Sequence, residues 1–225
     1  RNLQLIWNDK LLLASLALQS PFMVLVVKLT ADPNCFTSNL VNIGSRTALF
    51  ILAAMATFMG TLNSYREICK EREIILREAS VGVSLPAVVL SKAVVLFLIE
   101  ILQSVILAMG FVAIVHVPQN HLLLETDIEI FVTLLLTMFS SSCVGLLISA
   151  LFSNGESAIL GMGALGASTD LNSRMAWLQA GLDGPMYDAT VENLTHSWQM
   201  LGLISLVSLV AAWLVLQIAF DKKKA

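Results

Sequence analysis

Of the 225 residues in the chain, 57% are hydrophobic and only 13% are charged, and the formal net charge is −3. A soluble domain usually has about 25% charged residues, and a surface that binds nucleic acid needs clustered Lys and Arg. The composition therefore excludes a soluble enzyme and a nucleic-acid-binding module, and it predicts an integral membrane protein.

Five apolar segments are long enough to cross a bilayer as helices, so the predicted fold class is an all-α membrane protein. Residues 1–10 mix apolar and charged side chains at helical spacing, which predicts a short helix in the membrane interface. The predicted spans are residues 11–29, 47–63, 85–117, 130–152 and 198–220.

The most strongly charged part of the chain separates the second and third of these spans. Residues 66–80 consist mainly of good helix formers, and Glu73 and Arg77 form a favourable pair four residues apart. We therefore predict a helix over residues 66–80 that lies outside the membrane.

The distribution of Lys and Arg predicts the orientation, because these residues concentrate on the cytoplasmic side of membrane proteins. If residues 66–80 are cytoplasmic, ten of the 13 Lys and Arg residues lie inside, together with both chain ends. This topology requires an even number of spans, but the remaining apolar stretch, residues 158–167, is short and rich in Gly. We predict six spans with the fifth missing or truncated near residues 160–161, and a re-entrant pair over residues 156–168 is the alternative.

Three polar residues lie within the third predicted span, Glu100, Gln103 and Ser104, on the helical face that also carries Lys92. A carboxylate inside a membrane is costly and is by default a functional hypothesis, whereas Lys92 is expected to extend its amine to the interface. Two interpretations of Glu100 stay open: a cluster of hydrogen bonds between helices, or a polar lining of a transport path or a proton site.

Small residues recur every four positions in the fourth predicted span, at Thr137, Ser141, Gly145 and Ser149. Small side chains at this spacing let helices approach closely, so we predict helix packing here, with a substrate groove only where a partner helix separates. The His residues show no paired ligand spacing, so no metal site is predicted. The chain has no G-x-x-x-x-G-K-[ST] motif, which excludes ATP binding through a P-loop, and no catalytic site is predicted in it.

The block with the most specific pattern is residues 60–92, which read GTLNSYREICKEREIILREASVGVSLPAVVLSK. It resembles the permease domain of type-2 ABC exporters with the G-subfamily architecture, and the similarity extends to residues 144–150 and 168–172. Within this group the chain looks most like bacterial half-transporters that carry forkhead-associated domains and an N-terminal ATPase. The resemblance implies six spans, which agrees with the topology predicted from the charges.

The resemblance also implies a function for the charged helix between the second and third spans. In this family it is the coupling helix, which contacts the nucleotide-binding domain. The residues assigned to that contact by resemblance are Arg66, Glu67, Lys70, Glu71, Arg72, Arg77 and Glu78.

By the same resemblance, the chain is expected to be the membrane domain of an ATP-driven exporter of a lipophilic or amphipathic substrate, such as a lipid, a glycolipid or a drug. It is expected to act as a homodimer among the lipids of the plasma (inner) membrane. ATP and Mg are expected on an ATPase domain, upstream in the same polypeptide or in a separate subunit, and no cofactor is expected in this chain. Two alternatives stay open: a proton-coupled secondary transporter or channel that uses Glu100, and a non-transporting membrane scaffold.

Overall fold

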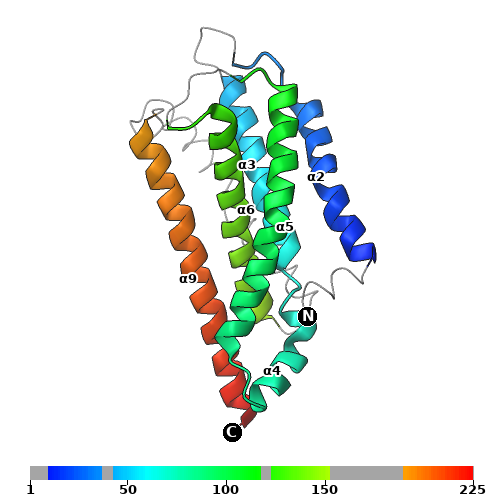
Figure 1. Ribbon diagram of the computed structural model, residues 1–225, viewed down its shortest axis with the longest axis vertical. Coiled ribbons are helices and arrows are strands. Elements are labelled where there is room, and N and C mark those ends of the chain that lie inside the picture. The colour runs from blue at the N-terminus through cyan, green and yellow to red at the C-terminus, as the bar shows by residue number, and fades with distance from the viewer. Residues whose placement is uncertain (1–9, 37–42, 118–122, 153–189, 225) are drawn as a thin grey trace, which may run out of the picture.

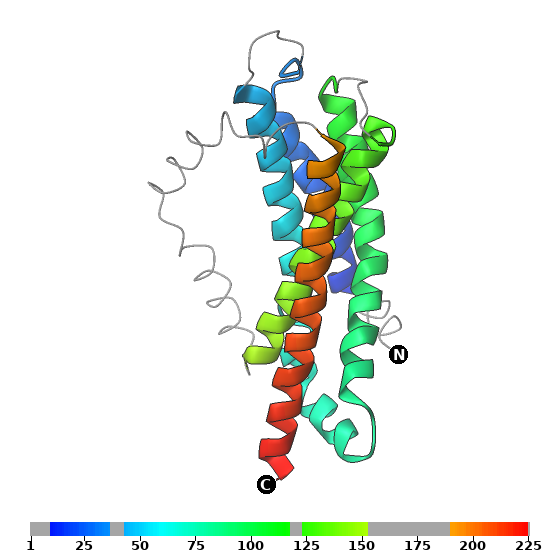
Figure 2. The same cartoon turned by 90° about the vertical axis from the view of Figure 1, so that its left-hand side faces the viewer.

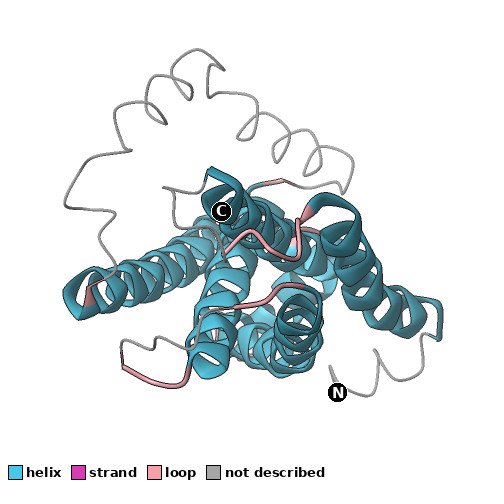
Figure 3. Ribbon diagram, turned by 90° about the horizontal axis from the view of Figure 1, so that it is seen from above, coloured by secondary structure: helices cyan, strands magenta, loops and turns pink. Residues whose placement is uncertain are grey.

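The computed structural model describes residues 10–36, 43–117, 123–152 and 190–224, and the regular structure in these ranges is entirely helical. Figure 3, which looks along the molecule from above, shows these helices gathered into one bundle. The all-α prediction is therefore confirmed. The predicted interfacial helix lies outside the described residues except for Lys10, and the predicted fifth span near residues 160–161 lies outside them as well.

The helices follow one another in an order close to that of the predicted spans (Figure 1). The described elements are α2 (Lys10–Thr30), α3 (Ile43–Ser64), the short 3-10 helix η1 (Cys69–Glu71), α4 (Arg72–Ser80), α5 (Leu85–Ile114), α6 (Thr126–Leu151) and α9 (Val191–Lys224).

Four of these helices, α3, α5, α6 and α9, are long and apolar enough to cross a membrane, and α2 contributes a shorter apolar stretch over Leu18–Thr30. Several helix ends differ from the predicted spans, and α3 and α6 each begin four residues earlier than predicted. Helix α5 stops at Ile114, before the predicted end at residue 117, because the backbone turns away and the His116 N–H donates to the Pro33 carbonyl at 3.0 Å. Helix α9 is longer than the predicted 198–220 at both ends.

The helices alternate in direction up to α6. In Figure 1, α2 and α5 run upward, α3 and α6 run downward, and α4 lies at the lower end near the last turns of α9. Figure 2 shows that α9 also runs downward, beside α6. The connection from the lower end of α6 to the upper end of α9 therefore falls in residues 153–189, outside the described residues.

Two apolar clusters hold the bundle together, and burial of such side chains is the main favourable contribution to folding. The upper cluster joins α2, α3, α5 and α6 through residues that include Val27, Met59, Leu107, Phe111 and Met138. The lower cluster joins α5, α6 and α9 to the segment between α3 and α5 through residues that include Ile68, Ile75, Leu96, Leu146 and Leu216. The lower cluster therefore fixes that segment to the bundle.

Candidate functional site

The chain between α3 and α5, residues 65–84, forms a compact unit at the lower end of the bundle, which we call the α3–α5 connector (Figure 1). A turn over residues 65–68 leads into η1 and then into α4. Gly82 then reverses the chain at a φ of 106°, a conformation that glycine adopts without steric cost. Ser84 and a proline in the first turn begin α5.

The predicted helix over residues 66–80 is interrupted, since α4 begins only at Arg72. The reason is a contact with α6. The Ser149 hydroxyl oxygen accepts hydrogen bonds from the backbone N–H groups of Ile68, at 2.9 Å, and Cys69, at 3.0 Å. These N–H groups are therefore not available to the carbonyls four residues earlier, as a continuous α-helix would require.

A second bond strengthens the same junction. The Arg72 guanidinium donates from Nη1 to the carbonyl oxygen of Ala150 at 3.2 Å. Carbonyls in the last turn of a helix lack partners inside the helix, and a cation near that end is favoured by the helix dipole. The connector is thus hydrogen-bonded to the lower end of α6 from both its backbone and a side chain.

Replacing Ser149 with Ala is expected to loosen this junction, because two N–H donors lose their acceptor. We expect a loss of about 1 kcal/mol of stability, as for removal of a helix-capping hydroxyl, and faster amide hydrogen exchange at Ile68 and Cys69. Ser141→Ala is the matched control, since the Ser141 hydroxyl donates only to the Thr137 carbonyl of its own helix, at 2.8 Å. Equal exchange rates in the two variants would contradict the contact.

Lys92 joins the connector to α5. The side chain is only 3% exposed, and Nζ lies 2.9 Å from Glu71 Oε2 and 3.4 Å from Glu67 Oε2. One buried cation therefore compensates two half-buried carboxylates. Removing one side of such an arrangement is costly because the other side is left without compensation.

The seven residues assigned to ATPase contact by resemblance separate into two groups. Three point outward, with exposed side chains, namely Arg66, Lys70 and Arg77. The other four are half-buried, namely Glu67, Glu71, Arg72 and Glu78. Glu67, Glu71 and Arg72 are engaged with α5 and α6, whereas the three cations are exposed to a partner.

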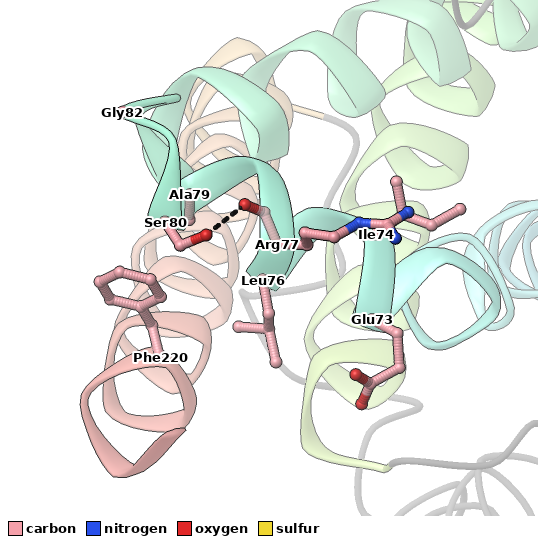
Figure 4. A pocket seen from close by; sticks show the side chains of 8 residues that line it. All are labelled: Glu73, Ile74, Leu76, Arg77, Ala79, Ser80, Gly82 and Phe220. Atoms are coloured by element: carbon pink, nitrogen blue, oxygen red, sulfur yellow. Dashed lines mark hydrogen bonds between the residues drawn. The ribbon is translucent and has the colours of Figure 1, made fainter. Parts of the chain in front are cut away.

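Helix α4 has an apolar underside and an open groove beside it. Ile75 is buried in the lower cluster, while Leu76 of α4 and Phe220 of α9 line a pocket of about 770 Å³, shown in Figure 4. Glu73 and Arg77 belong to the same pocket. The groove thus combines an apolar floor with charged side chains, a composition that suits contact with another protein surface.

The polar residues predicted within the third span are all buried in α5, namely Glu100, Gln103 and Ser104. Gln103 links three helices, since its Oε1 accepts from Asn63 of α3 at 2.6 Å and its Nε2 donates to Gln19 of α2 at 3.4 Å. Ser104 instead donates to the Ile101 carbonyl of its own helix at 3.0 Å. Glu100 is hydrogen-bonded to Ser142 of α6.

The small residues of α6 do not share one contact. Gly145 lies against α3, where an added Cβ would overlap the Ser64 hydroxyl and come 3.2 Å from the Thr61 carbonyl oxygen, and Ser149 bonds the connector. Thr137 and Ser141 are half-buried and donate to carbonyls of their own helix. The sequence analysis did not predict the contacts that Ser142 and Gln19 make with neighbouring helices.

Within the described residues, no three His, Cys, Asp or Glu side chains come together as a possible metal site.

The chain is similar to proteins of a known family. The family model described as ABC-2 type transporter matches residues 1–166. Over 110 residues, which are 48% of this chain, the sequence is 32% identical to the ABC transporter ATP-binding/permease protein of Mycobacterium tuberculosis, and the match covers 13% of that protein. No solved structure matches the chain.

The family match covers well over half of the chain, and the fold supplies helices of membrane-spanning length. The resemblance found in residues 60–92 is thereby confirmed. The chain is an integral membrane protein that belongs to the ABC-2 type transporter family, and it forms the permease domain.

Proposed function

We propose that this permease domain exports a lipophilic or amphipathic substrate, driven by an ATPase domain that acts on the α3–α5 connector. The relative from Mycobacterium tuberculosis is named as an ATP-binding and permease protein, which supports an ATPase partner in the same polypeptide or in a separate subunit. ATP and Mg bind on that partner. The observation that carries the proposal is the connector itself, which presents cations outward and is fastened inward to α5 and α6.

The connector is built to transmit a displacement. Its outward side chains Arg66, Lys70 and Arg77 are exposed, and complementary charges orient a soluble partner on such a surface. Its inward contacts reach two spanning helices, α5 through Lys92 and α6 through Ser149. A push on α4 therefore moves the lower ends of α5 and α6 together with it, as in other domain-driven rearrangements of packed helices.

The remaining features of the proposal come from charge distribution and resemblance. The excess of Lys and Arg on one side of the predicted topology places the connector and both chain ends on the cytoplasmic side of the plasma membrane. Broad apolar faces on α5 and α9, including exposed Leu102, Met109 and Leu206, suit contact with lipid and with a second copy. The working unit is a homodimer with two ATPase domains below it.

Charge reversal on the outward face tests the proposed contact. In Lys70→Glu combined with Arg77→Glu, we expect ATP hydrolysis by the reconstituted full-length transporter to fall about tenfold, because unlike charges facing the partner become like charges. The fold of the permease should be unaffected, since both side chains are exposed. The matched control is Lys28→Glu, an exposed cation at the upper end of α2.

Unchanged hydrolysis in the double variant would contradict a contact through these cations. Movement of a fluorescent phospholipid across vesicle membranes then tests the driving force. Movement that needs ATP and not a pH gradient supports the proposal, and movement that needs only a pH gradient supports a secondary transporter. Loss of the ATPase partner in a protein that moves no probe under either condition supports a scaffold.

A further inference from the structure

Glu100 lies midway along α5, and its side chain is fully buried, with 0% exposed. Its Oε1 atom is hydrogen-bonded to the Ser142 hydroxyl of α6. That hydroxyl oxygen also lies 2.7 Å from the carbonyl oxygen of Gly60 on α3. Three helices thus meet at one hydroxyl group, while Glu100 Oε2 has no hydrogen-bond partner among the described residues.

The number of hydrogens available to Ser142, Glu100 and the Gly60 carbonyl decides the charge of Glu100. A serine hydroxyl has one hydrogen to donate, whereas a backbone carbonyl and an ionised carboxylate can only accept. If Glu100 is ionised, the single hydroxyl hydrogen of Ser142 can be donated either to Glu100 or to the Gly60 carbonyl. The other contact then holds two oxygen atoms with no hydrogen between them. With a protonated Glu100, the carboxyl O–H donates to Ser142, and Ser142 donates to Gly60, so both contacts hold a hydrogen.

Among the described residues, no cation lies beside Glu100 to stabilise a carboxylate. Lys92 lies on the same helix about 12 Å away by helical rise, and its amine is paired with Glu67 and Glu71. On the helices that pack against α5, the other charged residues lie toward the helix ends, namely Lys10 and Lys28 of α2, Arg46 of α3, Asp127 and Glu129 of α6, and Glu192, His196, Asp221 and residues 222–224 of α9.

The connector, which includes α4 and also packs against α5, lies at the lower end of the bundle (Figure 1), away from the middle of α5 where Glu100 lies. The titratable side chain that faces Glu100 in the described part of α6 is Cys143, which interacts with it electrostatically. A thiol can only be neutral or negative, so it adds nothing favourable to a carboxylate. A buried carboxylate without a cation is strongly disfavoured, and such a group neutralises instead.

We propose that Glu100 is a proton-binding site, at which a bound proton links α5 to α3 through Ser142. The carboxylate of Glu100 takes one proton from water, and the resulting O–H begins a chain of two hydrogen bonds that ends at the Gly60 carbonyl. Release of that proton to water leaves a group that cannot donate, so ionisation favours separation of these helices. The site does not depend on the energy source of transport, and its test is independent of the ATPase.

Infrared spectroscopy of the full-length protein in lipid nanodiscs tests the site directly. A protonated carboxyl group has a C=O stretching band that a carboxylate lacks, and the band shifts in D₂O. We expect such a band at neutral pH in the unmodified protein and in Glu192→Gln, which removes an exposed carboxylate. We expect it to be absent in Glu100→Gln and to shift in Ser142→Ala, where the O–H loses its acceptor.

Thermal unfolding at several pH values supplies a second measurement. Above the ordinary pKa of a glutamate side chain, about 4.3, the unfolded chain releases a proton that the native state keeps. Stability then falls as pH rises, because the native state binds more protons than the unfolded state. The Tm of the unmodified protein should therefore fall relative to that of Glu100→Gln as pH increases, whereas the Tm of Glu192→Gln should follow the unmodified protein.

The proposal is overturned if Glu100→Gln leaves the infrared band in place, or if its Tm has the same pH dependence as that of the unmodified protein. An unchanged band in Ser142→Ala would overturn the link through Ser142. A Glu100→Gln protein that does not fold would also contradict the proposal, because a neutral amide of the same shape supplies the N–H donor that the carboxyl O–H is proposed to supply.

Discussion

Replacing Gly60 with Ala is expected to separate α3 from α6 and to lower the stability of the protein by about 3 kcal/mol, at the upper end of the usual cost of overpacking. The added Cβ would overlap the carbonyl oxygen of Met138 and lie 3.0 Å from its carbonyl carbon and 3.1 Å from its Cα. These are backbone atoms of a neighbouring helix, so no rotation of a side chain relieves the overlap. The helices must move apart along their contact.

The other glycines provide a graded comparison, measured as Tm in detergent. Gly145→Ala should have a smaller effect, because the atom that it overlaps most closely is the Ser64 hydroxyl, which can rotate. Gly202→Ala on α9 is the matched control, since its Cβ would have nothing within 4 Å. A Gly60→Ala protein as stable as Gly202→Ala would show that α3 and α6 do not approach as closely as described.

The same contact shows why sequence periodicity located the packed face of α6 only in part. A spacing of four residues advances by about 40° beyond a full turn at each step, because a helix has 3.6 residues per turn. Thr137 and Ser149 therefore lie about 120° apart around α6, and they meet different surroundings.

The face that meets α3 and the connector follows an alternating spacing of four and three. Its members are Met138, Ser142, Gly145 and Ser149. Met138 lies against Gly60, and Ser142 is hydrogen-bonded to the Gly60 carbonyl. Gly145 lies against Ser64, and Ser149 is hydrogen-bonded to the connector. This spacing keeps residues on one side of a helix. A search for alternating spacing would have identified Ser142, which a strict repeat of four leaves out.

Other features were not predictable because they depend on residues far apart in the chain. The composition and hydropathy of each segment predict helices, and the helical face shared by Glu100 and Gln103 predicts that they are buried together. The interruption of the helix over residues 66–80 depends on Ser149, 81 residues from Ile68. The position of Lys92 likewise depends on Glu67 and Glu71 folding back over α5, which no local pattern indicates.

Replacing Lys92 with Met is expected to produce the largest loss in the connector, about 3 kcal/mol, at the lower end of the cost of breaking a buried ion pair. The lower value applies because Glu67 and Glu71 keep 26% and 21% of their side-chain surface exposed, so water compensates part of their charge. Without the ammonium group, the two carboxylates repel each other, and the contact between connector and α5 opens. We expect a lower Tm and lower ATP hydrolysis by the full-length transporter.

A compensating variant separates the charge of Lys92 from its packing. In Glu67→Gln combined with Glu71→Gln and Lys92→Met, no charge is left without a partner, so stability should recover most of the loss. Lys70→Met is the control for removal of a nearby cation, because Lys70 is exposed and its Tm should remain close to that of the unmodified protein. If the triple variant stays as unstable as Lys92→Met, the buried stem of Lys92 holds the connector by packing, and the ion pairs do not. If stability returns while ATP hydrolysis stays low, the ion pairs do more than stabilise the fold. They are then needed to transmit the displacement of the connector to α5.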